Sequence, residues 1–221
     1  MSYNYTIVIF FFCLAPASYA EARIWLDEQI RFNSNESFVA IYNMPFLSRL
    51  NSGYTLSTIR LRQALQHLLI KHQSLRTSLI FDKETNQLLQ RIIDFNNNSR
   101  QLFTFIESIF ETDEQLNNII QDENSNSQLF DLTQGLVFRY HIVYYKEISL
   151  NSLLCDQDVI IFNFHHALFD FPSMDMFLDD LSQAYRTGQL TIDDKNSLRY
   201  LDCEHEYFSS LLKSYLCFLH I

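Results

Sequence analysis

Two adjacent histidines, His165 and His166, end an apolar run, and Asp170 follows shortly after them. Successive side chains of a strand point to opposite faces, so the two imidazoles diverge, which disfavours a shared metal ion. We expect one ring to face the interior and the other to project from the strand end. A neutral imidazole is suited to accept a proton, and Asp170 is placed to orient a ring or to fix the turn. Two ordinary histidines at a strand end with an aspartate before a helix are the competing explanation.

The elements around this pattern predict how the histidines are presented. Residues 158–165 are apolar on both faces, which predicts a central strand in a covered sheet. Pro172 and Asp175 favour the start of a helix after the turn, and Gly188 favours its end. The expected apolar stripe of this helix comprises Met174, Phe177, Leu178, Leu181 and Tyr185.

The rest of the chain mixes helices and strands. A second clear helix follows Gly53, with Thr55 or Ser57 as its cap and an apolar stripe at Leu61, Ala64, Leu65, Leu68 and Leu69. Further helices are expected at 21–32, 113–123 and from 198 onward, and strands at 37–50, 75–81, 87–93, 102–110 and 136–145. Because helices and strands do not alternate regularly, we expect an α/β fold, a two-layer sandwich of helices on a mixed sheet.

Composition excludes several classes of protein. The 221 residues suit one domain, and 48% hydrophobic residues are enough to bury a core. With 26 acidic and 16 basic side chains the net charge is −10, which argues against a nucleic-acid groove. The four cysteines are far apart, so we expect reduced thiols in a cytoplasmic protein.

The N-terminus contains an apolar segment, Thr6–Ala15, of ten residues. About 20 residues are needed to span a bilayer, so we expect no membrane span. The segment suits the apolar region of a signal peptide with Ser18–Ala20 as its cleavage site, although no Lys or Arg precedes it. A secreted protein, through Thr6–Ala20, is therefore the alternative to a cytoplasmic one.

The segment Asn163–Ser173 (NFHHALFDFPS) resembles the HHxxxDG signature of condensation domains of non-ribosomal peptide synthetases, members of the chloramphenicol acetyltransferase-like superfamily. Four more segments resemble motifs of that family, in the family's order: Ala15–Phe32, Tyr42–Leu50, Leu61–Phe81 and Phe130–Arg139. The resemblance implies the family's N-terminal lobe over residues 15–190. Residues 191–221 would then be a linker and the start of a second lobe.

The resemblance also implies a reaction. These domains join an acyl thioester, held on the phosphopantetheine arm of a carrier protein, to an amine or alcohol on a second carrier. His166 would act as general base, or would position the nucleophile and stabilise the tetrahedral intermediate. His165 and Asp170 would be structural, and Ser173 matches the motif's serine. Arg76 would buttress the site, a surface arginine after a helix being the alternative. The resemblance implies no cofactor or metal held by the chain itself.

The chain departs from the family pattern in three ways. Phe171 stands in place of the motif's glycine, so the loop is expected to be rearranged or the passage to His166 narrowed. Leu136 replaces a frequent proline. The chain stops just past the first lobe, whereas the second lobe would supply a wall of the tunnel and an arginine partner for Asp170.

Three functions follow as expectations. The first is an acyltransferase lobe that is nearly inactive without a second lobe, because catalysis needs a preorganised site that excludes water. The second is a non-catalytic half-domain that binds a carrier protein or another partner. The third is a small secreted protein. An apolar patch is expected where a second lobe would pack. Epimerisation and ester-forming domains share HHxxxD, so the motif leaves the reaction subtype open.

Overall fold

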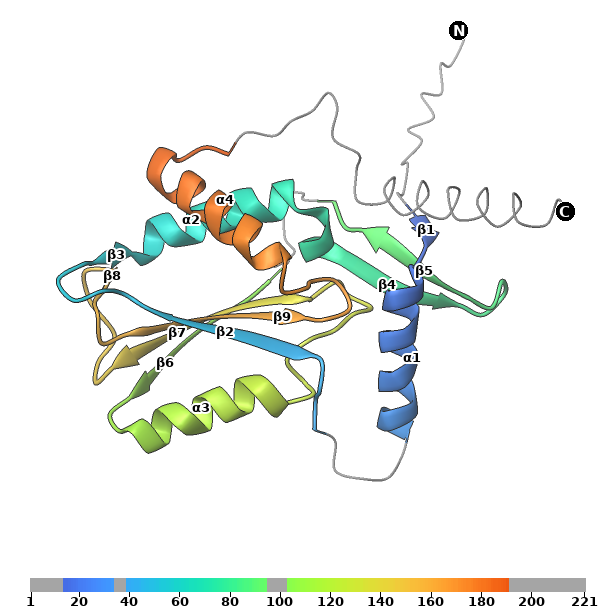
Figure 1. Cartoon of the computed structure of the whole chain (residues 1–221), viewed down its shortest axis with the longest axis horizontal. Coiled ribbons are helices and arrows are strands. Elements are labelled where there is room, and N and C mark those ends of the chain that lie inside the picture. The colour runs from blue at the N-terminus through green and yellow to red at the C-terminus, as the bar shows by residue number, and fades with distance from the viewer. Residues whose placement is uncertain (1–13, 34–38, 95–102, 191–221) are drawn as a thin grey trace, which may run out of the picture.

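The computed structural model describes residues 14–33, 39–94 and 103–190, and Figure 1 shows their arrangement. The strands are β1 (Leu14–Pro16), β2 (Asn43–Arg49), β3 (Leu56–Ser57), β4 (Thr77–Asp82), β5 (Gln87–Ile92), β6 (Thr104–Phe110), β7 (Phe138–Tyr145), β8 (Leu153–Leu154) and β9 (Val159–His165). The helices are α1 (Tyr19–Asn33), α2 (Thr58–Lys71), α3 (Asp113–Ser125) and α4 (Ser173–Thr187), with a short 3-10 helix at Gln73–Arg76. The expected linker and second-lobe start at 191–221 lie outside the described residues.

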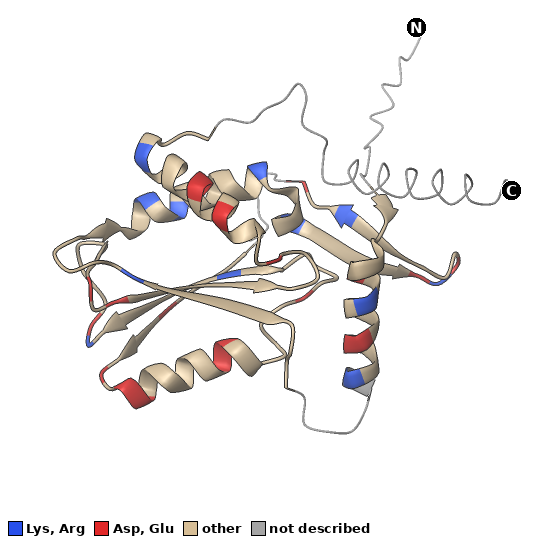
Figure 2. Cartoon of the chain, viewed as in Figure 1, with Lys and Arg blue, Asp and Glu red and all other residues tan. Residues whose placement is uncertain are grey.

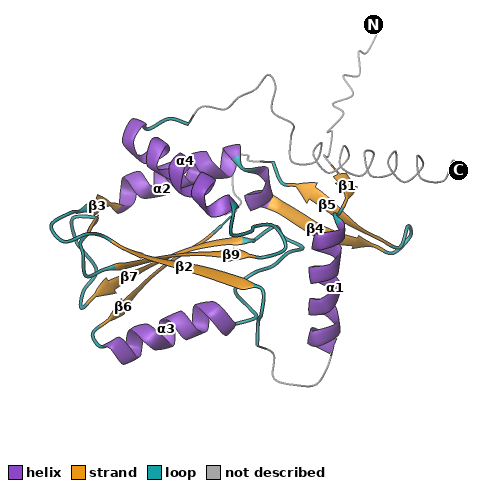
Figure 3. Ribbon diagram, viewed as in Figure 1, coloured by secondary structure: helices purple, strands orange, loops and turns teal. Residues whose placement is uncertain are grey.

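The strand that ends in the two histidines lies inside a four-stranded sheet of order β2-β9-β7-β6 (Figure 3). β6 runs parallel to β7, and the other neighbouring strands are antiparallel. All residues of β9 are buried, as predicted for a covered central strand. Pro45 is tolerated because β2 is an outer strand of this sheet. The expected α/β class with a mixed sheet is confirmed.

Helices α2 and α4 cover one face of this sheet (Figure 1). The predicted α2 stripe is buried throughout, and Ser57 caps this helix by accepting the backbone N–H of Arg60. On α4 the prediction was wrong for Leu178, which is 43% exposed, while Ala184 is buried. The buried positions 174, 177, 181 and 184 share one side of the helix, and Leu178 is turned away from that side.

Helix α3 covers the opposite face, which adds a third layer to the two-layer arrangement that the sequence predicted. Leu116 of α3 packs against Val143 of β7 and Ile161 of β9. Thr112 and Gln115 form a capping box at the start of the helix. The sheet is therefore sandwiched between helices, because side chains on both faces of β7 and β9 are buried.

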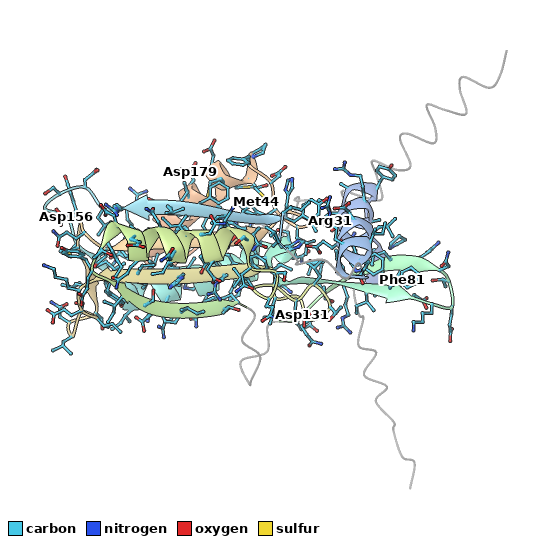
Figure 4. The ribbon with its side chains drawn as sticks, turned by 90° about the horizontal axis from the view of Figure 1, so that it is seen from below. Arg31, Met44, Phe81, Asp131, Asp156 and Asp179 are labelled. Carbon is cyan, nitrogen blue, oxygen red and sulfur yellow. The ribbon has the colours of Figure 1, made fainter. Side chains whose placement is uncertain are left out.

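A second sheet of order β1-β5-β4 lies beside the first, with α1 packed nearby. Figure 4 separates the two parts: Met44 of β2 lies in the larger one and Phe81 of β4 in the smaller one. Ala167 and Leu168, which follow the two histidines, are buried in a cluster with Ile24 of α1 and Leu79 of β4. The loop after β9 is thus held between the two parts.

The segment considered as a cleavage site is part of the fold. Ser18 and Glu21 bond to each other's backbone N–H groups at 3.1 and 2.7 Å, which caps the start of α1. The residues just before it form β1, which pairs with β5. Among the helices of the described ranges, none has both the length and the hydrophobicity to cross a membrane.

A buried carboxylate anchors α3 to the sheet. Glu123, 1% exposed, accepts hydrogen bonds from Arg139 Nε at 2.8 Å and His141 Nδ1 at 2.7 Å, both from β7. Asn163 of β9 donates to the other carboxylate oxygen at 2.9 Å. Burial favours the neutral acid, but the hydrogen bonds from His141, Asn163 and Arg139 outweigh it and lower the pKa of Glu123 below its ordinary value.

Removing this charge should destabilise the protein. Glu123→Gln should lower the free energy of unfolding by about 3 kcal/mol, because Arg139 would lose its buried partner. The matched control is Glu114→Gln, at an exposed position in the first turn of the same helix. It should cost less than ~1 kcal/mol. Urea titrations followed by circular dichroism measure both, and equal losses would contradict the anchoring role.

The same carboxylate should make stability fall in acid. Because the folded pKa of Glu123 is lower than the ordinary 4.5, the unfolded chain binds more protons between the two values. The stabilisation is therefore complete above the unfolded pKa and is lost as the pH drops through the folded one. Urea midpoints measured from about pH 7 down to about pH 3 should decline more steeply for the wild type than for Glu123→Gln. Parallel declines would show that another group is responsible.

Candidate active site

The peptide between the two histidines is fixed from both sides. The N–H of His165 donates to the carbonyl of Val137 at 3.0 Å, and the N–H of His166 donates to the carbonyl of Tyr42 at 2.9 Å. The carbonyl of His165 accepts the N–H of Leu168 at 3.0 Å, which closes the turn. His165 is 3% exposed, whereas His166 is exposed. One imidazole therefore faces inward and the other projects from the strand end.

His165 connects β9 to α1. Its Nδ1 accepts the backbone N–H of Ala167 at 3.2 Å, so the hydrogen of the neutral ring is on Nε2. That hydrogen is donated to Glu28 Oε1 at 2.9 Å. The rings of Tyr42 and Phe130 lie 6.3 and 5.6 Å from the imidazole. Both nitrogens are thus used by interior contacts.

His166 is held differently. Its Nδ1 lies 3.1 Å from the carbonyl oxygen of Phe169. A carbonyl only accepts hydrogen bonds, so Nδ1 carries the hydrogen and Nε2 of the neutral ring keeps its lone pair. The Tyr42 ring lies 6.4 Å away, centroid to centroid. The ring is therefore oriented by its own loop, with its basic nitrogen in the tautomer that accepts a proton.

Asp170 and Ser173 join the loop to the next helix. Asp170 Oδ1 accepts the backbone N–H of Ser173 at 3.0 Å and also its hydroxyl. Pro172 stands at the cap position of α4 and makes no side-chain cap bond. The carboxylate of Asp170 thus supplies the acceptor that the first turn of α4 requires. Asp170 is expected either to orient an imidazole ring or to fix the turn, and these hydrogen bonds fix the turn.

Arg76 is buried, so the alternative of a surface arginine is wrong. Its Nε donates to the carbonyl of Leu69 in the last turn of α2 at 2.9 Å, and its Nη1 donates to the carbonyl of Ile93 just after β5. These contacts place the guanidinium at the junction of α2 with the smaller sheet. His165, His166, Asp170 and Ser173 share one loop, and Arg76 belongs to a neighbouring junction.

Phe171 shows how the loop accommodates a side chain in place of glycine. It has no positive φ, so its backbone needs no glycine. Its side chain is 72% exposed and lies edge-on against Phe46 of β2, with ring centroids 5.1 Å apart. The contact directs Phe171 toward β2.

Two residues of this site were not predicted. Glu28 of α1 binds His165 from 137 positions away in the sequence. Tyr42 supplies the carbonyl for His166, and its hydroxyl donates to Asp27 at 3.0 Å. Hydrogen bonds from Arg31 and Tyr42 lower the pKa of Asp27. Figure 2 shows that α1 carries charges of both signs. Local periodicity identifies α1 as a helix, but nothing local indicates which carboxylate reaches β9.

The tautomer of His165 is testable through Glu28. Glu28→Gln keeps an oxygen that accepts the Nε2 hydrogen, so it should reduce the free energy of unfolding by less than ~1 kcal/mol. Glu28→Ala leaves that buried N–H unpaired and should cost about 1–3 kcal/mol. Urea denaturation compares the two variants. A glutamine variant as unstable as the alanine variant would contradict the assignment, because it would show that an acceptor oxygen alone does not satisfy the Nε2 hydrogen.

The chain is similar in sequence to several curated synthetases. The chain is 27% identical over 195 residues to the hybrid PKS-NRPS synthetase apdA of Emericella nidulans, and 27% identical over 176 residues to surfactin synthase subunit 1 of Bacillus subtilis. These matches cover 88% and 79% of this chain. The chain spans about 4% of the length of each relative.

The fold has solved counterparts. The starter condensation domain of the rhizomide synthetase RzmA matches with a TM-score of 0.64 at 16% identity, over 90% of this chain and 44% of that one. The epimerization domain from the third module of tyrocidine synthetase B matches with a TM-score of 0.60 at 16% identity, over 91% and 40%. The family model of the condensation domain matches residues 15–209. The chain, with its two histidines at the end of a covered strand, belongs to the condensation domain family.

Proposed function

We propose that this chain is the N-terminal lobe of a condensation-type acyltransferase, which joins an acyl thioester to an amine or an alcohol. In this proposal both reactants arrive on the phosphopantetheine arms of carrier proteins, in the cytoplasm, and the chain itself holds no cofactor. The observation that carries the proposal is His166: an exposed ring whose Nδ1 hydrogen is bonded to the Phe169 carbonyl, which leaves the Nε2 lone pair for a substrate.

The proposed step needs one proton acceptor. The nucleophile attacks the thioester carbonyl and passes its proton to Nε2 of His166. The tetrahedral intermediate then collapses, the C–S bond breaks, and the leaving thiolate takes the proton from His166. A positioned base contributes roughly 10²–10⁴ in rate. His165 and Asp170 hold the loop through Glu28 and Ser173. Arg76 braces the neighbouring junction of α2 with β5.

We also propose that a second lobe covers His166. This chain aligns with 44% of the rhizomide synthetase domain, whereas 90% of the chain itself is matched. On the described part of the chain the ring of His166 is exposed, so water competes with the nucleophile for its lone pair. A covering lobe would exclude that water and make the electrostatic contacts stronger.

A second candidate function is partner binding without catalysis. It is favoured by Phe171, a large apolar side chain that is 72% exposed where the family motif has glycine. An exposed aromatic ring beside the histidine loop suits a docking contact better than an open passage. This function would be supported if a carrier protein bound the wild type and a His166 variant equally well and neither of the two showed turnover.

The test joins this chain to the second lobe of a related condensation domain and supplies two loaded carrier proteins. Mass spectrometry of the carrier-bound product measures turnover. His166→Ala should reduce turnover by about 100-fold or more, with unchanged circular dichroism. His67→Ala, in the middle of α2, is the matched control and should keep full activity. Turnover that survives His166→Ala would remove this residue from the mechanism.

A further inference from the structure

A second histidine pairs with a serine away from the candidate active site. Ser108 Oγ of β6 lies 2.8 Å from His141 Nε2 of β7, and His141 Nδ1 lies 2.7 Å from Glu123 Oε1 of α3. Ser108 stands opposite Val143, which stands opposite Val159 at the start of β9. His166 follows the other end of β9, about 20 Å further along at ~3.3 Å per residue. His141 and His166 therefore belong to separate sites.

The hydrogen bonds have the direction that activates a serine. The carboxylate of Glu123 only accepts, so the hydrogen of neutral His141 is on Nδ1. Its Nε2 then accepts the hydroxyl hydrogen of Ser108. Nucleophile, base and orienting carboxylate stand in the order of a serine-hydrolase triad, which is recognised by geometry rather than by sequence position.

The orienting carboxylate is rigidly held. Glu123 also accepts bonds from Arg139 at 2.8 Å and from Asn163 at 2.9 Å. Its pKa is lowered by the bonds from His141, Asn163 and Arg139, against the effect of burial, so it is ionised at neutral pH. His141 is 5% exposed, and this shields the base from water. An imidazolium formed at His141 would lie directly against the Glu123 carboxylate.

Ser108 is within reach of a ligand. Ser108 is half-buried, and β6 is an outer strand of the four-stranded sheet in the described part of the chain. Phe110, two residues on and therefore on the same face, packs with Leu116 beneath α3. An apolar acyl group attached to Ser108 would lie on the face of β6 that carries Phe110.

We propose that Ser108 is an activated nucleophile that accepts an acyl group from a small ester or thioester. Ser108 Oγ attacks the carbonyl carbon while its proton moves to His141 Nε2. The bond to the alkoxide or thiolate breaks, and the leaving group takes that proton, which leaves an acyl-serine. Water then attacks, gives one proton to His141, and releases the carboxylic acid as Ser108 regains its hydrogen. This esterase activity is separate from the function proposed for His166.

The test treats the full chain with a fluorophosphonate probe, which forms an Oγ–P bond and releases fluoride. Peptide mapping by mass spectrometry locates the adduct. We expect the adduct on Ser108 of the native protein and its loss in Ser108→Ala, a small change at a half-buried position. Ser125→Ala, which removes a hydroxyl that donates to the Gln121 carbonyl on α3, should be labelled like the wild type.

Two further variants separate the activated serine from a structural network. His141→Gln should slow labelling by about 100-fold, because glutamine replaces the base with a group that does not take up the proton. His166→Ala should leave labelling unchanged, so this result stands apart from failure of the acyltransferase proposal. A wild-type protein that carries no adduct, or carries it on another serine, would overturn the proposal. Equal labelling rates in wild type and a folded His141→Gln would do the same.

Discussion

The burial of β9 on both faces is the constraint on which the rest of the structure depends. Ile160, Phe162 and Phe164 point toward α2 and α4, where they join the largest apolar cluster. The alternate positions point the other way and change from apolar to polar along the strand: Val159, Ile161, Asn163 and His165. A central strand with helices on both sides follows, because neither face tolerates water. The same alternation separates His165 from His166.

The polar end of β9 determines where two helices attach. Buried polar groups must find partners, and one left unpaired costs about 1–3 kcal/mol. Asn163 finds Glu123 of α3, and His165 finds Glu28 of α1. Helix α3 also packs on the four-stranded sheet through Leu116, whereas the apolar contacts of α1 are with the smaller sheet and the loop after β9. These two contacts fix α3 and α1 against the strand that presents the histidine loop.

Three imidazoles in this chain show how the partner of one ring nitrogen decides what the other can do. In His141 the Nδ1 hydrogen is donated to a carboxylate, and Nε2 accepts a hydrogen bond from a hydroxyl. In His165 a backbone N–H occupies Nδ1, so the remaining hydrogen is donated to Glu28. In His166 the Nδ1 hydrogen is donated to a carbonyl, and the residue is exposed. Only the rings with Nδ1–H keep a basic Nε2.

The sequence by itself determined the covered strand at 158–165, the α2 stripe, the opposite directions of His165 and His166, and the family. These features follow from periodicity and motif order, which are local. Tertiary structure alone decided that Glu28 meets His165, that Arg76 is buried against α2 and β5, and that Ser108, His141 and Glu123 align. It also decided that α3 covers the second face of the sheet. Such contacts join segments distant in the chain, and side-chain spacing within one segment carries no information about which other segment packs against it.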